Sequence, residues 1–355
     1  MSTIDAKRWL LFFSSIQNRR PAVIRQILTK RLSNSSLFWG LRYQILNYIN
    51  VCPHLKTAEY DRQIEFLCRQ NMLSQDSNRM VKLTKAGQLQ KNAVLSGKTL
   101  KNPELFYHYR IYDLIKMIRL FIQVASESSW GNKRYYVVIN DLECQLAIKQ
   151  WLRRFNLKTL QTAVATALTS FLSHEDQMEA WIFCSQLAGH DVIPATRQQL
   201  SDQSGFTQSE IDCVSLDLTS RFALYLLKIG SPLSPLIQQF RSRNTLYEKS
   251  LSALTMYKKG VDIQQMAIKK NLKESTVREH LLNAAVFKTD FPYSLFLSAK
   301  KKRELSNKLP ANIDEWEYRM VAEDLPEISF FDYRMYAIKR SHNELDDKKR
   351  TNKIS

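Results

Sequence analysis

The chain has 355 residues, of which 44% are hydrophobic and eight are glycine, so it can build two or three cores but offers little for glycine-rich phosphate loops or strand-rich folds. Fifty-two Lys and Arg against 34 Asp and Glu leave a net charge of +18, an excess that attracts polyanions and favours a nucleic-acid neighbourhood. The five cysteines lack the spacing of a zinc or redox site, and neither a secretory leader nor a bilayer-spanning run is visible. We therefore expect buried, reduced thiols in a cytoplasmic protein that can associate with the nucleoid and has no membrane contact.

The first hundred residues read as helices around one short hairpin. A polar hinge, Ser74 to Asn78, separates two short apolar runs, and Thr84 then caps a helix that begins Lys85-Ala86-Gly87. This order is typical of a winged-helix unit, and a plain hairpin on a helical bundle explains it equally well. The helices expected before the hinge cover residues 4–32, 38–49 and 57–73.

Residues 103–240 are dense in aromatic side chains at helical spacing, which indicates a helical core more often than a base-stacking surface. The most apolar of these helices is Tyr112 to Ala125, and Tyr135 to Ile139 is the clearest strand-like run. Gly230 to Pro235 is the best break before the last region. The expected organisation is an N-terminal helical, winged-helix-like domain (1–100), a central helical domain (101–240), a C-terminal helix-turn-helix domain (241–340) and a charged tail that frays (341–355).

The stretch between Tyr247 and Phe287 predicts three short helices with the spacing of a helix-turn-helix. The first helix ends at Lys258-Lys259-Gly260, where glycine tolerates a positive φ. Asp262 can cap the second helix, Ile263 to Lys270. The small side chain of Ala267 permits the close crossing that the motif needs. An ordinary helical hairpin in a core is the alternative.

The turn and the third helix complete the motif. Asn271 suits the left-handed backbone of a tight turn, and Leu272 is expected to plug it. Val277, Leu281 and Ala284 face inward at helical spacing, which leaves the polar positions Ser275, Arg278, Glu279 and Asn283 facing out. Glu274 and Glu279 would repel phosphates, and Lys273 is a poor helix cap, so the groove-reading chemistry is only half present.

Two further features follow the motif. The run Lys300 to Arg303 is by default a solvated helix face, but its closeness to the motif makes it a candidate for phosphate contacts. Ser329 and Asp332 have the spacing of a capping box, which predicts a last helix bearing Tyr333, Tyr336 and Ala337.

The sequence contains no recognisable catalytic motif. Ser96-Gly97-Lys98-Thr99 looks like the end of a phosphate-binding loop, but the position of its first glycine is Asn92 and a helix precedes it. The six histidines are isolated, and none forms a metal pair at i, i+4. We therefore expect no catalytic residue, no metal and no cofactor.

Several segments resemble a known family. Leu251 to Phe287 and Leu325 to Arg334 are similar to the helix-turn-helix module at the C-termini of some bacterial RecQ-type helicases. Together with Ser36 to Gly40, Leu83 to Gly87 and the helix Tyr109 to Ser128, they make the chain resemble the YpbB family of Firmicutes, stand-alone proteins that carry this module. Members are typically encoded beside a RecQ-like helicase, which implies a role as its partner. The chain has no helicase motor motif, so unwinding would belong to that partner.

The sequence therefore predicts a mainly α, multi-helical, non-enzymatic accessory factor of a RecQ-like helicase that acts in DNA replication, recombination or repair. A sequence-specific transcription regulator and a pure protein adaptor that never touches DNA are the two rivals. The residues expected to contact DNA, mostly through its backbone, are Lys269, Lys270, Lys273, Ser275, Arg278, Lys300, Lys301, Lys302 and Arg303.

Overall fold

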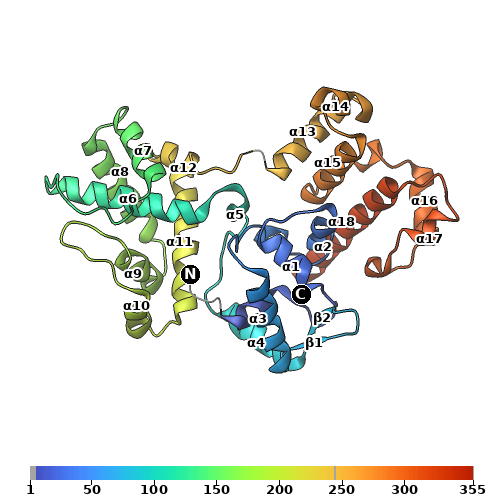
Figure 1. The fold of residues 1–355 in the computed structure, drawn as a ribbon, viewed down its shortest axis with the longest axis horizontal. Coiled ribbons are helices and arrows are strands. Elements are labelled where there is room, and N and C mark those ends of the chain that lie inside the picture. The colour runs from blue at the N-terminus through green and yellow to red at the C-terminus, as the bar shows by residue number, and fades with distance from the viewer. Residues whose placement is uncertain (1–4, 244, 355) are drawn as a thin grey trace. The chain divides into compact units, whose positions relative to one another are not determined.

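The computed structural model describes residues 5–243 and 245–354, without the side chains of residues 348–354, and is built almost wholly from helices. The chain forms two compact units, one from residues 1–30 and 47–242 and the other from residues 31–46 and 243–355 (Figure 1). The described residues form one sheet, a two-stranded hairpin. The predicted mainly α fold is therefore confirmed.

The N-terminal part of unit 1 surrounds the hairpin. Its strands pair antiparallel, with Ser74 opposite Lys82, and Arg19 adds an isolated bridge to Val81 on the second strand. Thr84 accepts a hydrogen bond of 3.0 Å from the backbone N–H of Gly87, which is the predicted cap. A Cβ on Gly87 would lie 1.9 Å from the Met72 carbonyl oxygen, so only glycine lets the following helix pack this closely. The elements are η1 (Ala6–Phe12), α1 (Pro21–Leu28), α3 (Thr57–Arg69), β1 (Leu73–Gln75), β2 (Val81–Leu83) and α4 (Lys85–Ser96).

The remainder of unit 1 is an α-helical body with its own apolar core. Phe121, Trp151 and Phe222 are among its largest buried side chains, and the indole N–H of Trp151 donates to the Pro232 carbonyl at 2.7 Å. The predicted aromatic-rich helices are thus core elements. They are α5 (Leu105–His108), α6 (Ile111–Ser129), α7 (Leu142–Leu152), α8 (Leu157–Leu172), α9 (Gln177–Ser185), α10 (Arg197–Ser204), α11 (Gln208–Lys228) and α12 (Ser234–Gln238).

Unit 2 combines one helix from the N-terminal region with the C-terminal helices. Ser329 and Asp332 form the predicted capping box, with Ser329 Oγ donating to Asp332 Oδ2 at 2.6 Å and accepting from the Asp332 N–H at 3.2 Å. The last helix continues to Ile354 and buries His342, so the start of the predicted fraying tail is part of the core. The elements are α2 (Asn34–Arg42), α13 (Leu246–Lys258), α14 (Ile263–Lys270), α15 (Glu274–Phe287), η3 (Tyr293–Leu295), α16 (Ala299–Lys308), η4 (Ile313–Glu315), α17 (Arg319–Ala322) and α18 (Phe330–Ile354).

Three expectations were wrong. The single helix predicted over residues 38–49 ends at Arg42, because Gln44 adopts a left-handed backbone with φ 58° before η2 (Leu46–Tyr48) begins. The run Tyr135 to Ile139 is not a strand, because the side chain of Gln123 takes its backbone hydrogen bonds, from the Val138 N–H and to the Tyr136 carbonyl. Among the five thiols, expected to be buried, Cys184 is exposed.

Among the described residues, no helix has both the length and the apolar character needed to cross a membrane.

Candidate nucleic-acid interface

The helix-turn-helix forms within unit 2 with the predicted helix boundaries and caps. Asp262 accepts a hydrogen bond of 2.7 Å from the Gln265 N–H and starts α14, and Gly260 before it has φ 84°. At the other end of α14, Asn271 is left-handed (φ 50°, ψ 52°), and the Leu272 N–H donates to the Ala267 carbonyl at 2.9 Å. This last bond is the i→i−5 bond of a Schellman motif, which satisfies a helix-end carbonyl and reverses the chain.

The turn is held by its backbone more than by its apolar side chain. Met266 and Ala267 of α14 are buried, in agreement with the close helix crossing predicted at Ala267. Leu272 was expected to plug the turn, but it is 36% exposed. The Schellman hydrogen bond and the left-handed Asn271 already fix this turn, so no buried plug is needed there.

The third helix, α15, has exposed polar residues around the buried Val277 in its first two turns, and its last two turns are buried. Glu274, Ser275, Arg278 and Glu279 are exposed, whereas the six residues from Leu281 to Val286 are all buried. Asn283, predicted to face out, is only 4% exposed. Recognition helices read base edges with their N-terminal residues, so the accessible half of α15 is the half that can reach a groove.

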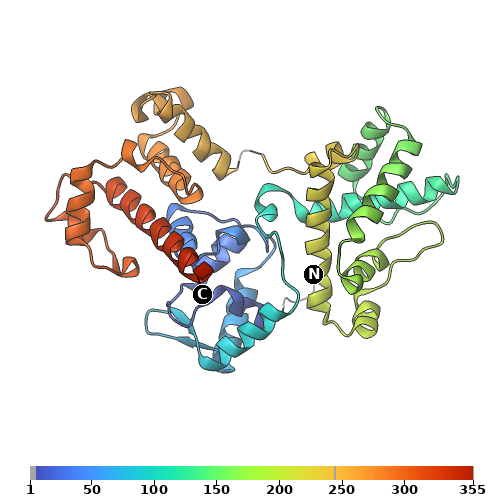
Figure 2. The same cartoon turned by 180° about the vertical axis from the view of Figure 1, so that it is seen from behind.

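Two helices from distant parts of the chain cover the buried half of α15. Both α18 and α2 pack against it (Figures 1 and 2). The imidazole Nε2 of His342 on α18 lies 2.9 Å from the Ala285 carbonyl oxygen, which fixes α18 to the last turn of α15. Simple periodicity within residues 247–287 could not reveal this cover, because its residues lie outside that stretch.

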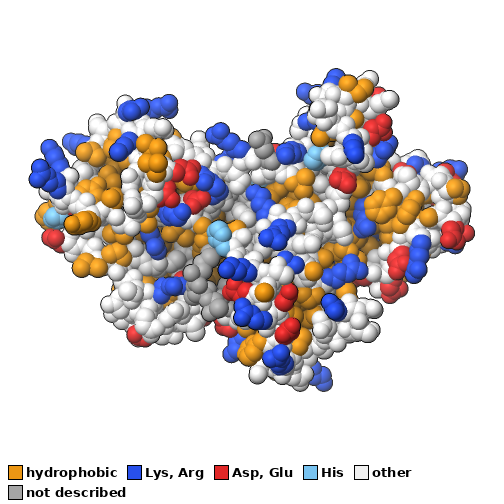
Figure 3. Space-filling model, viewed as in Figure 1, with side chains coloured by type: hydrophobic (Ala, Val, Ile, Leu, Met, Phe, Trp, Pro, Cys, Tyr) orange, Lys and Arg blue, Asp and Glu red, His pale blue; other side chains and the backbone are white. Residues whose placement is uncertain are grey.

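The accessible face of the motif mixes positive and negative charges. Arg278 Nη2 lies 3.0 Å from Glu274 Oε2, an i, i+4 ion pair that neutralises both groups locally. Lys273, at the start of α15, makes no side-chain cap. Lys269 and Lys270 are exposed at the end of α14, where Lys270 Nζ donates to Ser252 Oγ at 3.0 Å. Over α13 and α14, Figure 3 shows Lys and Arg side chains interspersed with Asp and Glu.

One histidine borders this face. Burial, and then the charges of Lys249 and Lys270, lower the pKa of His280 below its usual value, against the opposite effect of Glu279. Its Nδ1 is buried and has no hydrogen-bond partner among the described residues. His280 thus serves as a neutral packing group.

The basic run lies on α16, and its four residues differ in their surroundings. Lys301 Nζ lies 2.8 Å from Asp332 Oδ2, and Asp332 also belongs to the capping box of α18. Lys301 therefore links α16 to the start of α18. Lys300 approaches Glu304 at 3.7 Å, Lys302 is half-buried and Arg303 is exposed.

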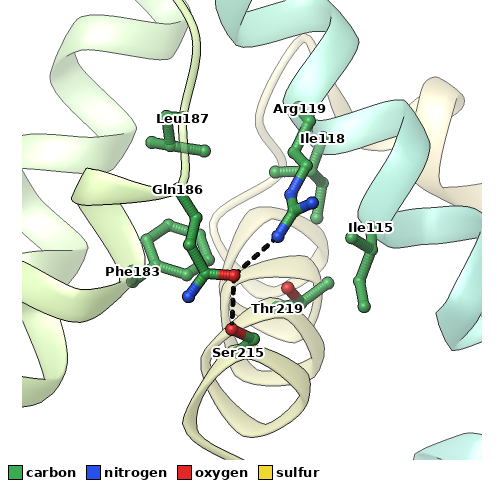
Figure 4. A pocket seen from close by; sticks show the side chains of 8 residues that line it. All are labelled: Ile115, Ile118, Arg119, Phe183, Gln186, Leu187, Ser215 and Thr219. Carbon is green, nitrogen blue, oxygen red and sulfur yellow. Dashed lines mark hydrogen bonds between the residues drawn. The ribbon is translucent and has the colours of Figure 1, made fainter. Parts of the chain in front are cut away.

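Two polar features of unit 1 bear on whether it has chemistry of its own. Lys98, in the sequence that resembles a phosphate-binding loop, donates to Glu179 Oε1 at 2.7 Å, so it belongs to an internal ion pair. A cavity of about 10 Å³, lined in part by Arg119, Gln186 and Ser215, has room for about one water molecule (Figure 4). Among the described residues, no group of three or more His, Cys, Asp or Glu could hold a metal ion.

Comparisons with known proteins agree with this geometry. The family model described as a helix-turn-helix domain matches residues 250–337, which cover α14 to α17 and most of α13. The chain is also 24% identical over 195 residues to Protein YpbB of Bacillus subtilis (strain 168). That match covers 54% of this chain and 55% of the relative, so the chain spans about half the length of the curated relative it matches. No solved structure matches. The chain therefore has a C-terminal helix-turn-helix domain. This domain supports placing the chain in the class of DNA-binding proteins.

Proposed function

We propose that the chain is a non-enzymatic, cytoplasmic DNA-binding adaptor and the accessory partner of a RecQ-like helicase in replication, recombination or repair. The observation that carries the DNA-binding part is that the polar residues in the first two turns of α15 are exposed, directly after a capped α14. A helix-turn-helix places this end of its third helix in the major groove. The net charge of +18 supports a polyanionic ligand.

In this proposal the contacts are mostly to phosphates. Lys273, Ser275 and Arg278 meet the duplex from α15, while Lys269 and Lys270 reach phosphates from the end of α14. The Glu274–Arg278 pair leaves little free charge for reading bases, which favours backbone contact over a defined operator. From α16, Lys300, Lys302 and Arg303 add phosphate contacts. Lys301 adds less, because Asp332 already neutralises it.

The helicase partnership rests on family resemblance. The similarity to Protein YpbB covers about half of each chain and supports a common ancestry. Unit 1, the larger body, would be the docking surface. A pull-down of the tagged chain from nuclease-treated extract should capture a RecQ-like helicase. Capture that disappears on nuclease treatment would mean that DNA, rather than contact, joins the two proteins.

The N-terminal part of unit 1 supports a winged-helix-like unit rather than a plain hairpin. The order is η1, a bridging residue Arg19, α1, α3 and a β-hairpin whose second strand pairs with Arg19. The exposed charges of α3 have both signs, Asp61 and Glu65 beside Arg62 and Arg69, so this helix offers phosphates no net attraction. We therefore assign duplex contact to unit 2, and protein contact to this unit.

The test of DNA binding uses the full chain and a fluorescein-labelled 20-base-pair duplex at low salt. Lys273→Glu with Lys269→Glu should weaken binding about tenfold or more, because each change replaces an attraction to phosphate by a repulsion. Lys149→Glu with Arg153→Glu makes the same change of charge on two exposed residues at the end of α7 and just after it, and should have a much smaller effect. Equal losses in the two double variants would overturn a local DNA contact.

A pure protein adaptor is the second candidate, and the neutralised Glu274–Arg278 pair favours it. It predicts no duplex binding by the unmodified chain at low salt. A transcription regulator predicts instead a footprint at one defined sequence and, for a dimer, half-sites about one helical turn apart.

A further inference from the structure

A second exposed surface lies at the end of α6 in unit 1, far along the chain from the helix-turn-helix. It consists of the loop 130–138 and the neighbouring turn 189–193, and we refer to it as the aromatic loop. Trp130 is 73% exposed and Tyr136 is 98% exposed. Large aromatic side chains usually bury most of their surface, so two such rings on one short loop point to a ligand.

The aromatic loop is held in place by buried polar side chains. Glu127 Oε2 accepts from the Asn132 amide at 2.7 Å and lies 3.1 Å from His190 Nδ1, which ties the loop to the turn. Gln123 is buried and bonds to the backbone of Tyr136 and Val138 at 2.9 and 2.8 Å. These bonds fix a segment that forms no sheet, so its rings are presented in a preorganised way.

The Trp130 ring has one supported face. The imidazole of His190 stacks on it at a centroid distance of 5.4 Å and an interplanar angle of 27°. Because His190 covers one face of the Trp130 indole, the exposed surface of Trp130 belongs to the rest of the ring system. This exposed surface can stack on a further flat ring. The backbone of Tyr136 is bonded to Gln123, which lies about 9 Å back along α6 from Ser129 at 1.5 Å of rise per residue.

Positive charge lies between the two aromatic residues. Lys133 and Arg134 are exposed, and within the described part of the chain neither makes an ion pair. The acidic groups nearby are engaged with His190, Glu127 at 3.1 Å and Asp191 at 3.6 Å. At this edge of unit 1, Figure 3 shows Lys and Arg, a His and hydrophobic side chains next to one another.

We propose that the aromatic loop binds single-stranded nucleic acid, with bases stacked on Trp130 and Tyr136 and phosphates held by Lys133 and Arg134. Aromatic rings beside unpaired cations are the components of such sites. A duplex does not fit, because its bases are already stacked on one another and cannot cover a protein ring. A protein partner would use the apolar side chains, and the cations between the rings favour the nucleic acid. The site is independent of the helicase partnership and of the duplex contact proposed for unit 2.

The experiment measures fluorescence anisotropy of labelled dT20 with the full chain at low salt, with rU20 and a 20-base-pair duplex as parallel probes. Trp130→Ala should weaken dT20 binding about tenfold, and Trp130→Phe should restore most of it, because phenylalanine keeps a stacking face. Lys133→Glu with Arg134→Glu should weaken it further than Lys149→Glu with Arg153→Glu, the matched change at the end of α7. The ratio of dT20 to rU20 affinity tells DNA from RNA as the preferred strand.

Several results would overturn the proposal. They are dT20 affinity unchanged in Trp130→Ala, equal losses in Trp130→Ala and Trp130→Phe, and no binding of dT20 or rU20 by the unmodified chain. Loss of duplex binding together with dT20 binding in the Trp130 variants would also contradict a site for single strands. Failure of the duplex site proposed for unit 2 would be distinguishable. In that case, Lys273→Glu with Lys269→Glu would leave duplex affinity unchanged.

Discussion

At the scale of single residues, Arg42 determines how unit 2 is held together. Its Nε lies 2.8 Å from Asp314 Oδ1 on η4, and its Nη1 lies 2.6 Å from Glu344 Oε2 on α18. The guanidinium is thus satisfied by two carboxylates from segments about 270 and 300 positions later in the chain. An arginine suits this place, because its planar fork can donate to two acceptors at once.

Replacing Arg42 by alanine should lower the free energy of unfolding of unit 2 by about 3 kcal/mol, because two half-buried carboxylates lose their counter-charge. The measurement is urea denaturation of the full chain followed by the fluorescence of its tryptophans, which include Trp39 and Trp316 of this unit. Arg31→Ala, an exposed arginine of the same segment, is the control and should change stability little. Similar losses in both variants would mean that Arg42 has no special role.

At the scale of elements, α2 is the unexpected component of the helix-turn-helix unit. It packs against α15 and α18, and Leu37, Phe38 and Leu41 on it are buried. The guanidinium of Arg334 on α18 lies 4.2 Å from the centroid of the Phe38 ring, within the range of a cation–π contact. The family model for the helix-turn-helix domain begins at residue 250, so α2 lies outside the matched segment.

Phe38→Ala should destabilise unit 2 by about 3 kcal/mol or more, because it leaves a cavity between α2 and α18. The loss should also weaken duplex binding, since α15 loses part of its support. Thermal unfolding followed by circular dichroism checks the first effect and duplex anisotropy checks the second. Phe66→Ala on α3 removes a half-exposed ring and serves as the control. A stable Phe38→Ala protein would show that α2 only rests on the unit.

At the scale of the whole molecule, the charge excess has two proposed uses on two units. The helix-turn-helix face is locally mixed in charge, so much of its duplex affinity must come from lysines and arginines around it. Phosphate contacts of this kind release counterions. Each contact makes the binding constant fall by about 0.9 logarithmic units for every tenfold rise in salt concentration. The slope of the logarithm of duplex affinity against the logarithm of salt concentration therefore reports the number of phosphate contacts.

Lys302→Glu with Arg303→Glu should flatten the salt dependence of duplex binding by about two units of slope, as two phosphate contacts are lost. Lys301→Gln should change that slope little, because the Lys301 ammonium already faces Asp332 at 2.8 Å. The measurement is duplex anisotropy over a series of salt concentrations. A slope that stays the same in the double variant would remove α16 from the interface.

Local patterns predicted the local parts of this protein. The caps at Asp262 and Ser329, the left-handed Asn271 and the bounds of α14 were all correct, since each depends on residues within a few positions of one another. The strand predicted at Tyr135 to Ile139 failed for a non-local reason. The backbone of this run is hydrogen-bonded to the side-chain amide of Gln123 on the preceding helix. No pattern of alternating residues can indicate such a partner.

The sequence by itself determined the mainly helical character, the caps of α14 and α18 and the position of the helix-turn-helix, because propensity, capping and apolar period act over one or two turns. Only the tertiary structure decided which half of α15 is accessible and that α2 joins the C-terminal helices. It also decided that, among the described residues, Lys301 has an ion-pair partner while Lys133 and Arg134 have none. The physical reason is the same in each case. Burial and ion pairing depend on contacts between residues from distant parts of the chain, and the packing of the whole unit determines these contacts.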